Sequence, residues 1–171
     1  GGHDDDNQTF IAAFVVENPA LFGKTVRQAA GVTHLHFVIS RLWRQGSVTI
    51  PGPDTVLEHE DRLLVVTTDK DVEGLTTLFG AQEQRDWNTG HIDWNAIDSS
   101  LISRHIVVSR PELNGRKLGS LKLRNSYGIN ITRVVRSGVT LLASPGLILQ
   151  LGDRLTVVGE EKSIAQVARV V

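Results

Sequence analysis

Apolar and polar positions follow the same order twice along the chain. In the first copy, strand-like apolar segments cover residues 10–16, 37–42, 47–50 and 63–66, and helical spacing covers residues 24–30 and 71–78. In the second copy, the strand-like segments cover residues 105–108, 129–134, 139–142 and 155–158, and the helical ones 117–124 and 163–170. Leu118, Leu121 and the aliphatic part of Lys122 fall at the spacing of one helix face. The pattern predicts an α+β protein made of two tandem copies of a small two-layer lobe.

The two copies align without a gap when the chain is shifted by 92 positions. The matches include Val15-Val16 with Val107-Val108, Pro19 with Pro111, Gly23 with Gly115, Gly46 with Gly138, Pro53 with Pro145, and Asp61-Arg62-Leu63 with Asp153-Arg154-Leu155. One offset that holds for glycines, prolines and apolar runs indicates a duplicated domain, since two copies are too few for a solenoid. Gln45-Gly46 and Ser137-Gly138 predict tight turns at equivalent places.

The duplication divides the chain into four parts. We expect a flexible acidic tail at residues 1–9, a first domain at 10–80, a linker at 81–99 and a second domain at 100–171. The linker is polar but holds Trp87 and Trp94. Because large aromatic side chains bury apolar area, we expect both tryptophans to pack on a lobe or on a partner chain.

Composition narrows the classes of protein that the chain can belong to. Of its 171 residues, 40% are hydrophobic and 22% are charged, as in folded proteins. The formal net charge of -1 favours neither nucleic acid nor an anionic membrane. Without cysteine, the chain forms no disulfide and offers no thiolate to a metal. No apolar run approaches the roughly 18–20 residues that span a bilayer, and the lack of any methionine indicates a piece of a longer protein.

Short motifs do not support an enzyme. Gly23-Lys24-Thr25 resembles the end of a phosphate loop, but Asn18 stands where that loop needs a glycine, and Pro19 has no amide hydrogen to offer. His34 and His36 share a strand face, but no third ligand is near in the sequence, so packing or exposure is favoured over a metal site. A nucleophile elbow, a paired-histidine helix and a dinucleotide fingerprint are missing. We therefore expect neither a catalytic site nor a bound metal.

Four arginines repeat around one turn in both copies: Arg41, Arg44, Arg133 and Arg136. Guanidinium groups at equivalent sites of two lobes can line an anion site, because they fork onto phosphate or carboxylate. The alternative, which we favour, is that they form ion pairs with Asp61 and Asp153, which repeat equally faithfully.

Three segments of the second copy resemble the TrkA-C domain, the carboxyl-terminal lobe of the potassium-conductance regulator (RCK) module. They are Gly-Arg-Lys-Leu-Gly-Ser-Leu at 115–121, Tyr-Gly-Ile-Asn-Ile-Thr-Arg-Val-Val-Arg-Ser-Gly at 127–138 and Leu-Gln-Leu-Gly-Asp-Arg-Leu-Thr-Val-Val-Gly at 149–159. The first copy departs from this pattern at Glu60, which replaces a glycine, and at Thr67, which replaces the closing glycine. Two adjacent copies are most similar to the cytoplasmic loop of the aspartate–alanine exchanger family, where paired TrkA-C domains lie between two blocks of membrane helices.

The resemblance implies small lobes that pair through their sheets, a homodimer, and a cytosolic ligand that regulates the transmembrane helices of the same polypeptide. It places the domains on the cytoplasmic side of a bacterial inner membrane. Some relatives bind cyclic di-adenylate at an interface lined by aliphatic side chains and a polar or basic group, which makes a nucleotide the implied effector. The positions that match are Ile39, Arg41, Pro53, Ile131, Arg133 and Pro145, and the anion interpretation adds Arg44 and Arg136.

Two other functions are compatible with the sequence. A TrkA-C pair also occurs in potassium channel or uptake regulators, where a Rossmann lobe is expected directly upstream. A purely structural module would dimerise the transporter and bind no ligand.

Overall fold

The computed structural model describes residues 9–90, 92–95, 97 and 100–171. Apart from Thr9, the expected acidic tail lies outside these described residues. The chain divides into two compact units, one of which holds residues 10–92 and the other residues 93–171. Each unit is an α+β lobe, as the sequence pattern predicts.

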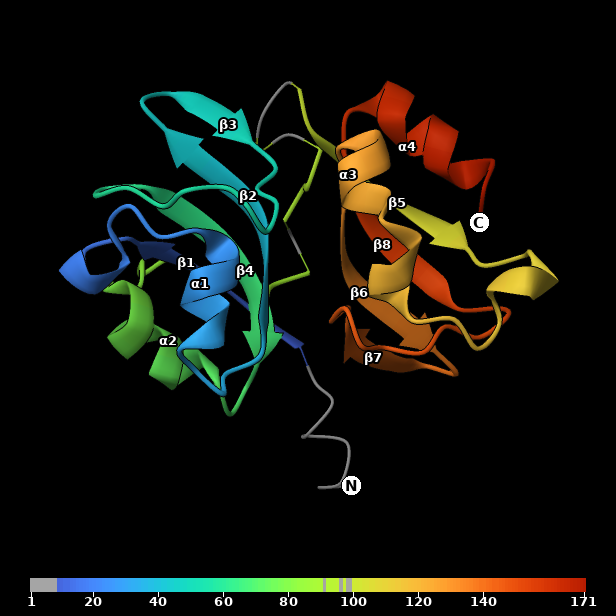
Figure 1. The fold of residues 1–171 in the computed structure, drawn as a ribbon, viewed down its shortest axis with the longest axis horizontal. Helices are drawn as coiled ribbons and strands as arrows, with labels where there is room; N and C mark the ends of the chain where they lie inside the picture. The colour runs from blue at the N-terminus through green and yellow to red at the C-terminus, as the bar shows by residue number, and fades with distance from the viewer. Residues whose placement is uncertain (1–8, 91, 96, 98–99) are drawn as a thin grey trace. The chain divides into compact units, whose positions relative to one another are not determined.

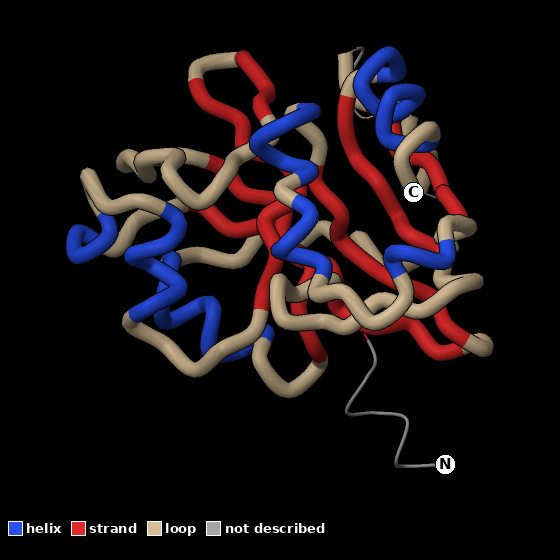
Figure 2. Tube along the Cα trace, turned by 45° about the vertical axis from the view of Figure 1, so that its right-hand side comes forward, coloured by secondary structure: helices blue, strands red, loops and turns tan. Residues whose placement is uncertain are grey.

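The first lobe is a four-stranded sheet with helices on one face (Figures 1 and 2). Its elements are β1 (Thr9–Val15), the 3-10 turn η2 (Pro19–Leu21), α1 (Val26–Gly31), β2 (Phe37–Arg44), β3 (Ser47–Thr49), β4 (Arg62–Thr68) and α2 (Val72–Phe79). The strand order is β1-β4-β2-β3, and β2 runs antiparallel to both β3 and β4. Ala29 of α1 and Leu75 of α2 share one apolar cluster with Phe14, Leu42 and Leu63 of the strands.

The second lobe repeats this architecture. Its elements are β5 (Ile102–Val107), η3 (Pro111–Leu113), η4 (Leu118–Leu121), α3 (Leu123–Tyr127), β6 (Asn130–Arg136), β7 (Val139–Leu142), β8 (Arg154–Gly159) and α4 (Glu161–Ala168). The sheet is antiparallel with the order β5-β8-β6-β7, which matches the order of the first sheet. Leu123, Ile164 and Val167 of the helices pack with Val134 and Leu155 of the strands in one core.

Two-residue turns close the hairpins β2–β3 and β6–β7. Arg44 pairs with Ser47, and Arg136 pairs with Val139, so each loop holds the two residues between them. Both residues of each turn have positive φ: 51° and 79° for Gln45-Gly46, and 50° and 79° for Ser137-Gly138. Such turns match the twist of the flanking strands, and glycine adopts positive φ without steric cost. The predicted tight turns are confirmed.

Both lobes carry a β-bulge at the same place in their second strand. The register shifts between Ile39 and Arg41 in β2, and between Ile131 and Arg133 in β6. Side chains normally alternate between the faces of a sheet, and an extra residue interrupts this alternation. Ile39 therefore points into the core, whereas Arg41 pairs with Leu64 on the face that the helices leave uncovered. We call this second face the outer face of each sheet.

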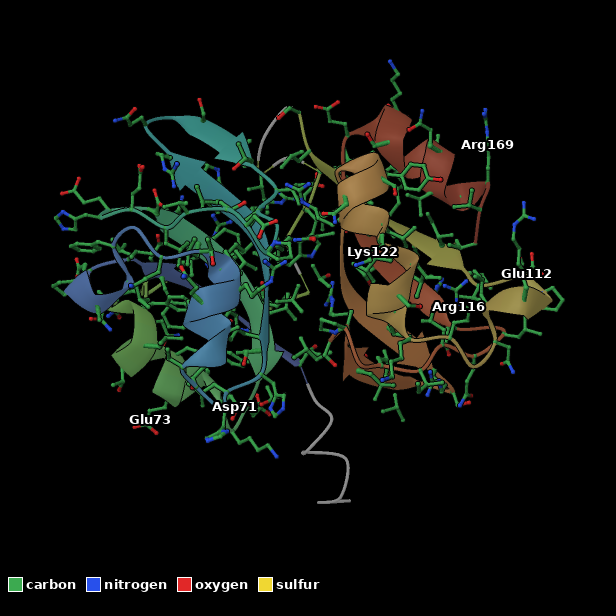
Figure 3. All side chains as sticks on the ribbon, in the orientation of Figure 1. Asp71, Glu73, Glu112, Arg116, Lys122 and Arg169 are labelled. Atoms are coloured by element: carbon green, nitrogen blue, oxygen red, sulfur yellow. The ribbon has the colours of Figure 1, made fainter. Side chains whose placement is uncertain are left out.

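The helical segment that follows the glycine turn differs between the lobes. In the first lobe, Thr25 and Gln28 form a capping box that begins α1. In the second lobe no side chain caps η4, and Lys122 adopts a left-handed conformation (φ 55°) between η4 and α3 (Figure 3). The helical segment expected over residues 117–124 is therefore present, but it is divided at Lys122 into η4 and α3. The amide of Gly119 donates to the carbonyl of Pro145 instead, which holds η4 as a short turn.

Candidate functional site

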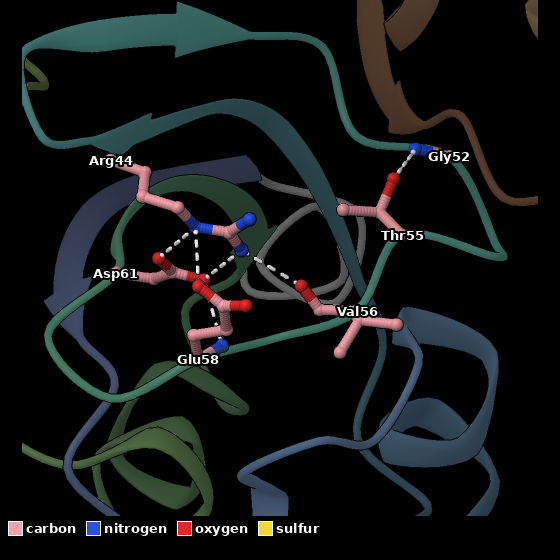
Figure 4. Close-up of polar contacts among 6 residues, drawn as sticks. All are labelled: Arg44, Gly52, Thr55, Val56, Glu58 and Asp61. Carbon is pink, nitrogen blue, oxygen red and sulfur yellow. Dashed lines mark hydrogen bonds and ion pairs between the residues drawn. The ribbon is translucent and has the colours of Figure 1, made fainter.

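Arg44 of β2 forms a bidentate ion pair with Asp61 (Figure 4). Its Nε and one terminal nitrogen each lie 2.7 Å from an oxygen of Asp61, and the same terminal nitrogen donates to the carbonyl of Val56 at 2.8 Å. The Asp61 carboxylate also accepts the amide of Glu58 at 2.9 Å. The side chain of Asp61 is 1% exposed and that of Arg44 is 35% exposed, so the pair is a clamp with a buried carboxylate between β2 and the loop before β4.

The second lobe repeats this clamp, except that Gln150 stands where Glu58 places a second carboxylate 3.2 Å from Nε of Arg44. Arg136 donates to both oxygens of Asp153 at 2.8 Å and to the carbonyl of Ile148 at 2.8 Å, and Asp153 accepts the amide of Gln150 at 2.9 Å. Burial raises the pKa of Asp153, but the hydrogen bonds from Arg136 and Gln150 and the charge of Arg136 lower this pKa by more, to a net value below the ordinary 3.8. Arg44 and Arg136 are thus engaged in the ion pairs that were the favoured alternative to an anion site.

Arg133 has different surroundings, on the outer face of the second sheet. It pairs with Thr156 of β8, and Thr156 pairs with His105 of β5, which places the three residues in one row across the sheet. The Thr156 hydroxyl lies 3.3 Å from Nδ1 of His105. Partial burial lowers the pKa of Arg133. Within the part of the chain that the structure describes, no carboxylate forms an ion pair with Arg133.

The electrostatics of this row favour an anion. The pKa of His105 is lowered by partial burial first, and then by the positive charges of Arg154 and Arg133. Two arginines therefore act on one side of the sheet, and the row contributes a hydroxyl and an imidazole as further polar groups. A phosphate or carboxylate is the kind of group that such donors bind, because guanidinium groups fork onto its oxygens. We call His105, Arg133, Arg154 and Thr156 the basic row.

Arg41 holds the equivalent place in the first lobe, but the residues in the same row on the two neighbouring strands are apolar. Its partner on β4 is Leu64, and Ala13 stands in β1 where His105 stands in β5. Arg41 is 1% exposed and Leu64 is also buried. The predicted symmetric pair of arginines thus occupies two chemically different outer faces.

The remaining candidate residues do not join these rows. Ile39 and Ile131 belong to the cores of their lobes, on the opposite face from Arg41 and Arg133 because of the bulge. Pro53 and Pro145 lie in exposed loops, where their carbonyls accept the amides of Arg27 and Gly119. A surface built on the basic row of one chain therefore does not include Ile131.

The weak motifs also find ordinary structural roles. The amides of Gly23 and Gly115 donate to the carbonyls of Leu57 and Leu149, so neither turn presents these groups to a phosphate. His36 donates its backbone amide to Asp71 at the start of α2 (Figure 3). No group of three potential metal ligands occurs among the described residues, and none of the helices described is long and apolar enough to cross a bilayer.

Two groups of functional interest escaped the sequence analysis. The basic row includes His105 and Thr156, which have no counterparts in the first copy and lie far apart in the sequence. Asn88 and Asn95 of the linker bond to the edge strands β1 and β5. The signal for these asparagines was present, because the tripeptide Asp-Trp-Asn occurs twice, at residues 86–88 and 93–95.

The fold defines a class: a tandem of small α+β lobes, each an antiparallel sheet with helices on one face. The TrkA-C domain model matches residues 11–80 and 102–171, which together make up most of the chain. The chain belongs to the TrkA-C domain family.

Similar proteins carry these two lobes within a longer chain. An uncharacterized transporter of Bacteroides thetaiotaomicron is 65% identical over 168 residues, which is 98% of this chain and 30% of the transporter. One of Porphyromonas gingivalis is 48% identical over 169 residues, covering 97% of this chain and 30% of the transporter. The RCK_C domain dimer of S. agalactiae BusR in complex with c-di-AMP is 25% identical with a TM-score of 0.37, and the match covers 39% of this chain and 91% of that one. The chain thus spans less than a third of the length of these curated relatives.

Proposed function

We propose that this TrkA-C pair is the regulatory part of a membrane transporter of the aspartate–alanine exchanger type. Relatives that match nearly the whole chain are transporters, and they are about three times as long as the matched segment. Their remaining length provides room for transmembrane helices in the same polypeptide. The lobes would then lie on the cytoplasmic side of the inner membrane, as a homodimer, and report the presence of an effector to those helices.

The basic row supports an anionic effector, and it is the observation that carries this proposal. Arg133 is partly buried on an outer face, no described carboxylate pairs with it, and it shares this face with Thr156, His105 and Arg154. Holding an unneutralised guanidinium in such a place costs solvation free energy, which a bound phosphate or carboxylate would restore. Cyclic di-adenylate and adenine nucleotides carry phosphates of this kind, and acidic amino acids carry carboxylates.

The regulatory step is a linkage between effector binding and lobe arrangement. An effector shifts the transporter only by the difference between its affinities for two arrangements of the domains. A ligand that neutralises the basic row in one arrangement and not in the other meets this requirement.

Thermal stability of the chain, measured against a panel of anions, tests the proposal. The panel contains cyclic di-adenylate, ATP, AMP, aspartate and inorganic phosphate. A ligand at 100 times its dissociation constant adds roughly 2.7 kcal/mol of stability, which raises the melting temperature of a chain of this size by about 5–10 °C. We expect one member to do so, and Arg133→Ala to abolish the shift.

Two variants make this test specific. Arg133→Lys keeps the charge but loses the fork, so it should retain part of the shift. Arg116→Ala removes an exposed arginine outside the basic row and should leave the shift intact. A flat panel, or a shift that survives in Arg133→Ala, overturns the effector site. Light scattering that shows a dimer without any ligand effect would then favour a structural assembly module.

A further inference from the structure

The chain that follows α2 turns back along β1, the edge strand of the first sheet. Val15 donates its amide to the carbonyl of Ala81 at 2.9 Å, and Glu83 donates to the carbonyl of Ala13 at 2.8 Å. Further along, the Asn88 side chain completes the edge: its Oδ1 accepts the amide of Ile11 at 2.8 Å, and its Nδ2 donates to the carbonyl of Ile11 at 2.9 Å. One side chain thus imitates a pairing strand at this residue.

Asn88 is oriented by its own tripeptide. The Asp86 carboxylate accepts the backbone amide of Asn88 at 2.8 Å, which forms a tight local turn. Between them, Trp87 is 1% exposed, and the guanidinium of Arg85 lies 4.0 Å from the centre of its ring. The turn presents the amide side chain to β1.

The second Asp-Trp-Asn tripeptide repeats this arrangement on the second lobe. The Asp93 carboxylate accepts the amide of Asn95 at 3.1 Å, and Oδ1 of Asn95 accepts the amide of Ser103 at 3.0 Å. Trp94 is half-buried. Ser103 of β5 is the equivalent of Ile11 of β1 under the offset of 92 that relates the two lobes. The same tripeptide therefore meets the same backbone position of each sheet.

We propose that residues 86–88 and 93–95 are two copies of one docking motif, an edge clip, and that each copy fastens the linker to its own lobe. The four residues between the clips then form the tether that joins the lobes. The division of the chain into compact units falls within this short stretch, between Ile92 and Asp93. The clips belong to different lobes, so each can open without the other.

Opening of a clip changes the reach of the tether. With both clips closed, the chain from Asn88 to Asp93 spans at most about 18 Å when fully extended. With the second clip open, the chain from Asn88 to Ile102 spans at most about 50 Å. A few side-chain hydrogen bonds therefore control how far the two lobes can separate.

Amide hydrogen exchange and inter-lobe distances test the clips in the same chain. Asn88→Ala should speed exchange of the Ile11 amide about five-fold and leave Ser103 unchanged, since one hydrogen bond of ordinary strength is lost. Asn95→Ala should do the reverse. Asn114→Ala is the matched control, because it removes a similar bond, which the Leu151 amide donates to Oδ1 of Asn114 at 3.1 Å, away from both edges.

The chain lacks cysteine, so Val32→Cys and Lys162→Cys place one spin label on each lobe at exposed positions. Asn95→Ala should extend the label-to-label distance distribution to longer values, and Asn114→Ala should not. Unchanged exchange at Ser103 in Asn95→Ala overturns the clip. Faster exchange with an unchanged distance distribution overturns its control of the tether.

The bond from Asn88 to the Ile11 carbonyl, on the carbonyl side of the first clip, gives a sharper test. Asn88→Asp keeps the acceptor for the Ile11 amide but replaces the donor to the Ile11 carbonyl with an oxygen that repels it. It should therefore open the first clip nearly as much as Asn88→Ala. An Asn88→Asp variant with the exchange rates of the unmodified chain would contradict the two-point docking of this side chain.

Discussion

The outer faces of the two sheets differ in chemistry, whereas the ion-pair clamps of the two lobes closely match. On the first sheet this face holds Ala13, Leu64 and Val66, which are all buried. At two of the three equivalent positions the second sheet has a polar residue, with His105 for Ala13 and Thr156 for Leu64. The clamps Arg44–Asp61 and Arg136–Asp153 are, by contrast, the same to within about 0.1 Å. The duplication has kept the clamps and the outer-face arginines, Arg41 and Arg62 with Arg133 and Arg154, and has changed the residues beside Arg41 and Arg133 on the two neighbouring strands.

This difference separates a structural role from a binding role. A residue that fixes the fold must serve both copies in the same way, and the clamps do. A residue that recognises a partner can change in one copy while the other copy still folds, as the residues of the basic row have done. The second lobe is therefore where we expect an anion, because the first lobe has Ala13 and Leu64 where the second has His105 and Thr156 beside its arginine.

The largest expected effect comes from breaking the shared clamp. Asp61→Ala and Asp153→Ala each remove the carboxylate that accepts two hydrogen bonds from the arginine and one from a loop amide. Each should lower the free energy of unfolding by about 2–3 kcal/mol, measured by urea denaturation. Equal losses in the two lobes would show that the clamp was preserved for stability.

Asp54→Ala provides the matched control for the clamp. Asp54 also binds an arginine, Arg27, but both side chains are mostly exposed, at 80% and 66%. Exposed pairs contribute little, so this variant should lose no more than about 0.5 kcal/mol. A clamp variant that behaves like Asp54→Ala contradicts the structural role.

A smaller effect should follow from exchanging one core position between the lobes. Thr67 of β4 is buried and donates to the carbonyl of His36 at 2.5 Å. Gly159 stands at the equivalent place, where an added Cβ would lie 2.5 Å from Cγ2 of Ile129. Gly159→Thr should therefore destabilise the chain by about 1–3 kcal/mol through overpacking.

A second substitution links this loss to its cause. Ile129→Ala removes the side chain that an added Cβ at residue 159 would meet. In an Ile129→Ala background, Gly159→Thr should therefore lower the free energy of unfolding by less than it does alone. Additive losses in the double-variant cycle would contradict this explanation. Melting curves of the four variants give the comparison.

Most of the fold, but little of the proposed binding surface, could be predicted from the sequence. The repeat offset and the turn glycines predicted the strands and hairpins, because turn chemistry and alternation are local properties. The bulges at Ser40 and Thr132 depend on how the strands pair, which the sequence alone does not reveal. For this reason Ile131 and Arg133 were grouped in one site although they point to opposite faces of the sheet. The basic row joins three strands that are distant in sequence, and only the register between strands brings His105 next to Thr156.

The smallest expected effect is electrostatic, and it tests the difference between the outer faces. His105 has a pKa below the ordinary 6.5 in the folded chain. As the pH falls below 6.5, the histidine of the unfolded state binds a proton before that of the folded state. The contribution of His105 to the free energy of unfolding is therefore complete above pH 6.5 and declines as the pH falls toward the folded pKa. His105→Gln should therefore lose less stability between pH 7.5 and pH 5 than the unmodified chain does.

Titration of the His105 ring by NMR connects this effect to the proposed anion. Arg133→Gln and Arg154→Gln should each raise the pKa of His105, since both positive charges oppose its protonation. An anion bound at the basic row should raise this pKa as well, because it adds a negative charge nearby. If the pKa of His105 is unchanged in Arg133→Gln, the charge of Arg133 does not act on His105. The arginine would then not belong to one anion site with His105, and the two lobes would differ in packing but not in what they bind.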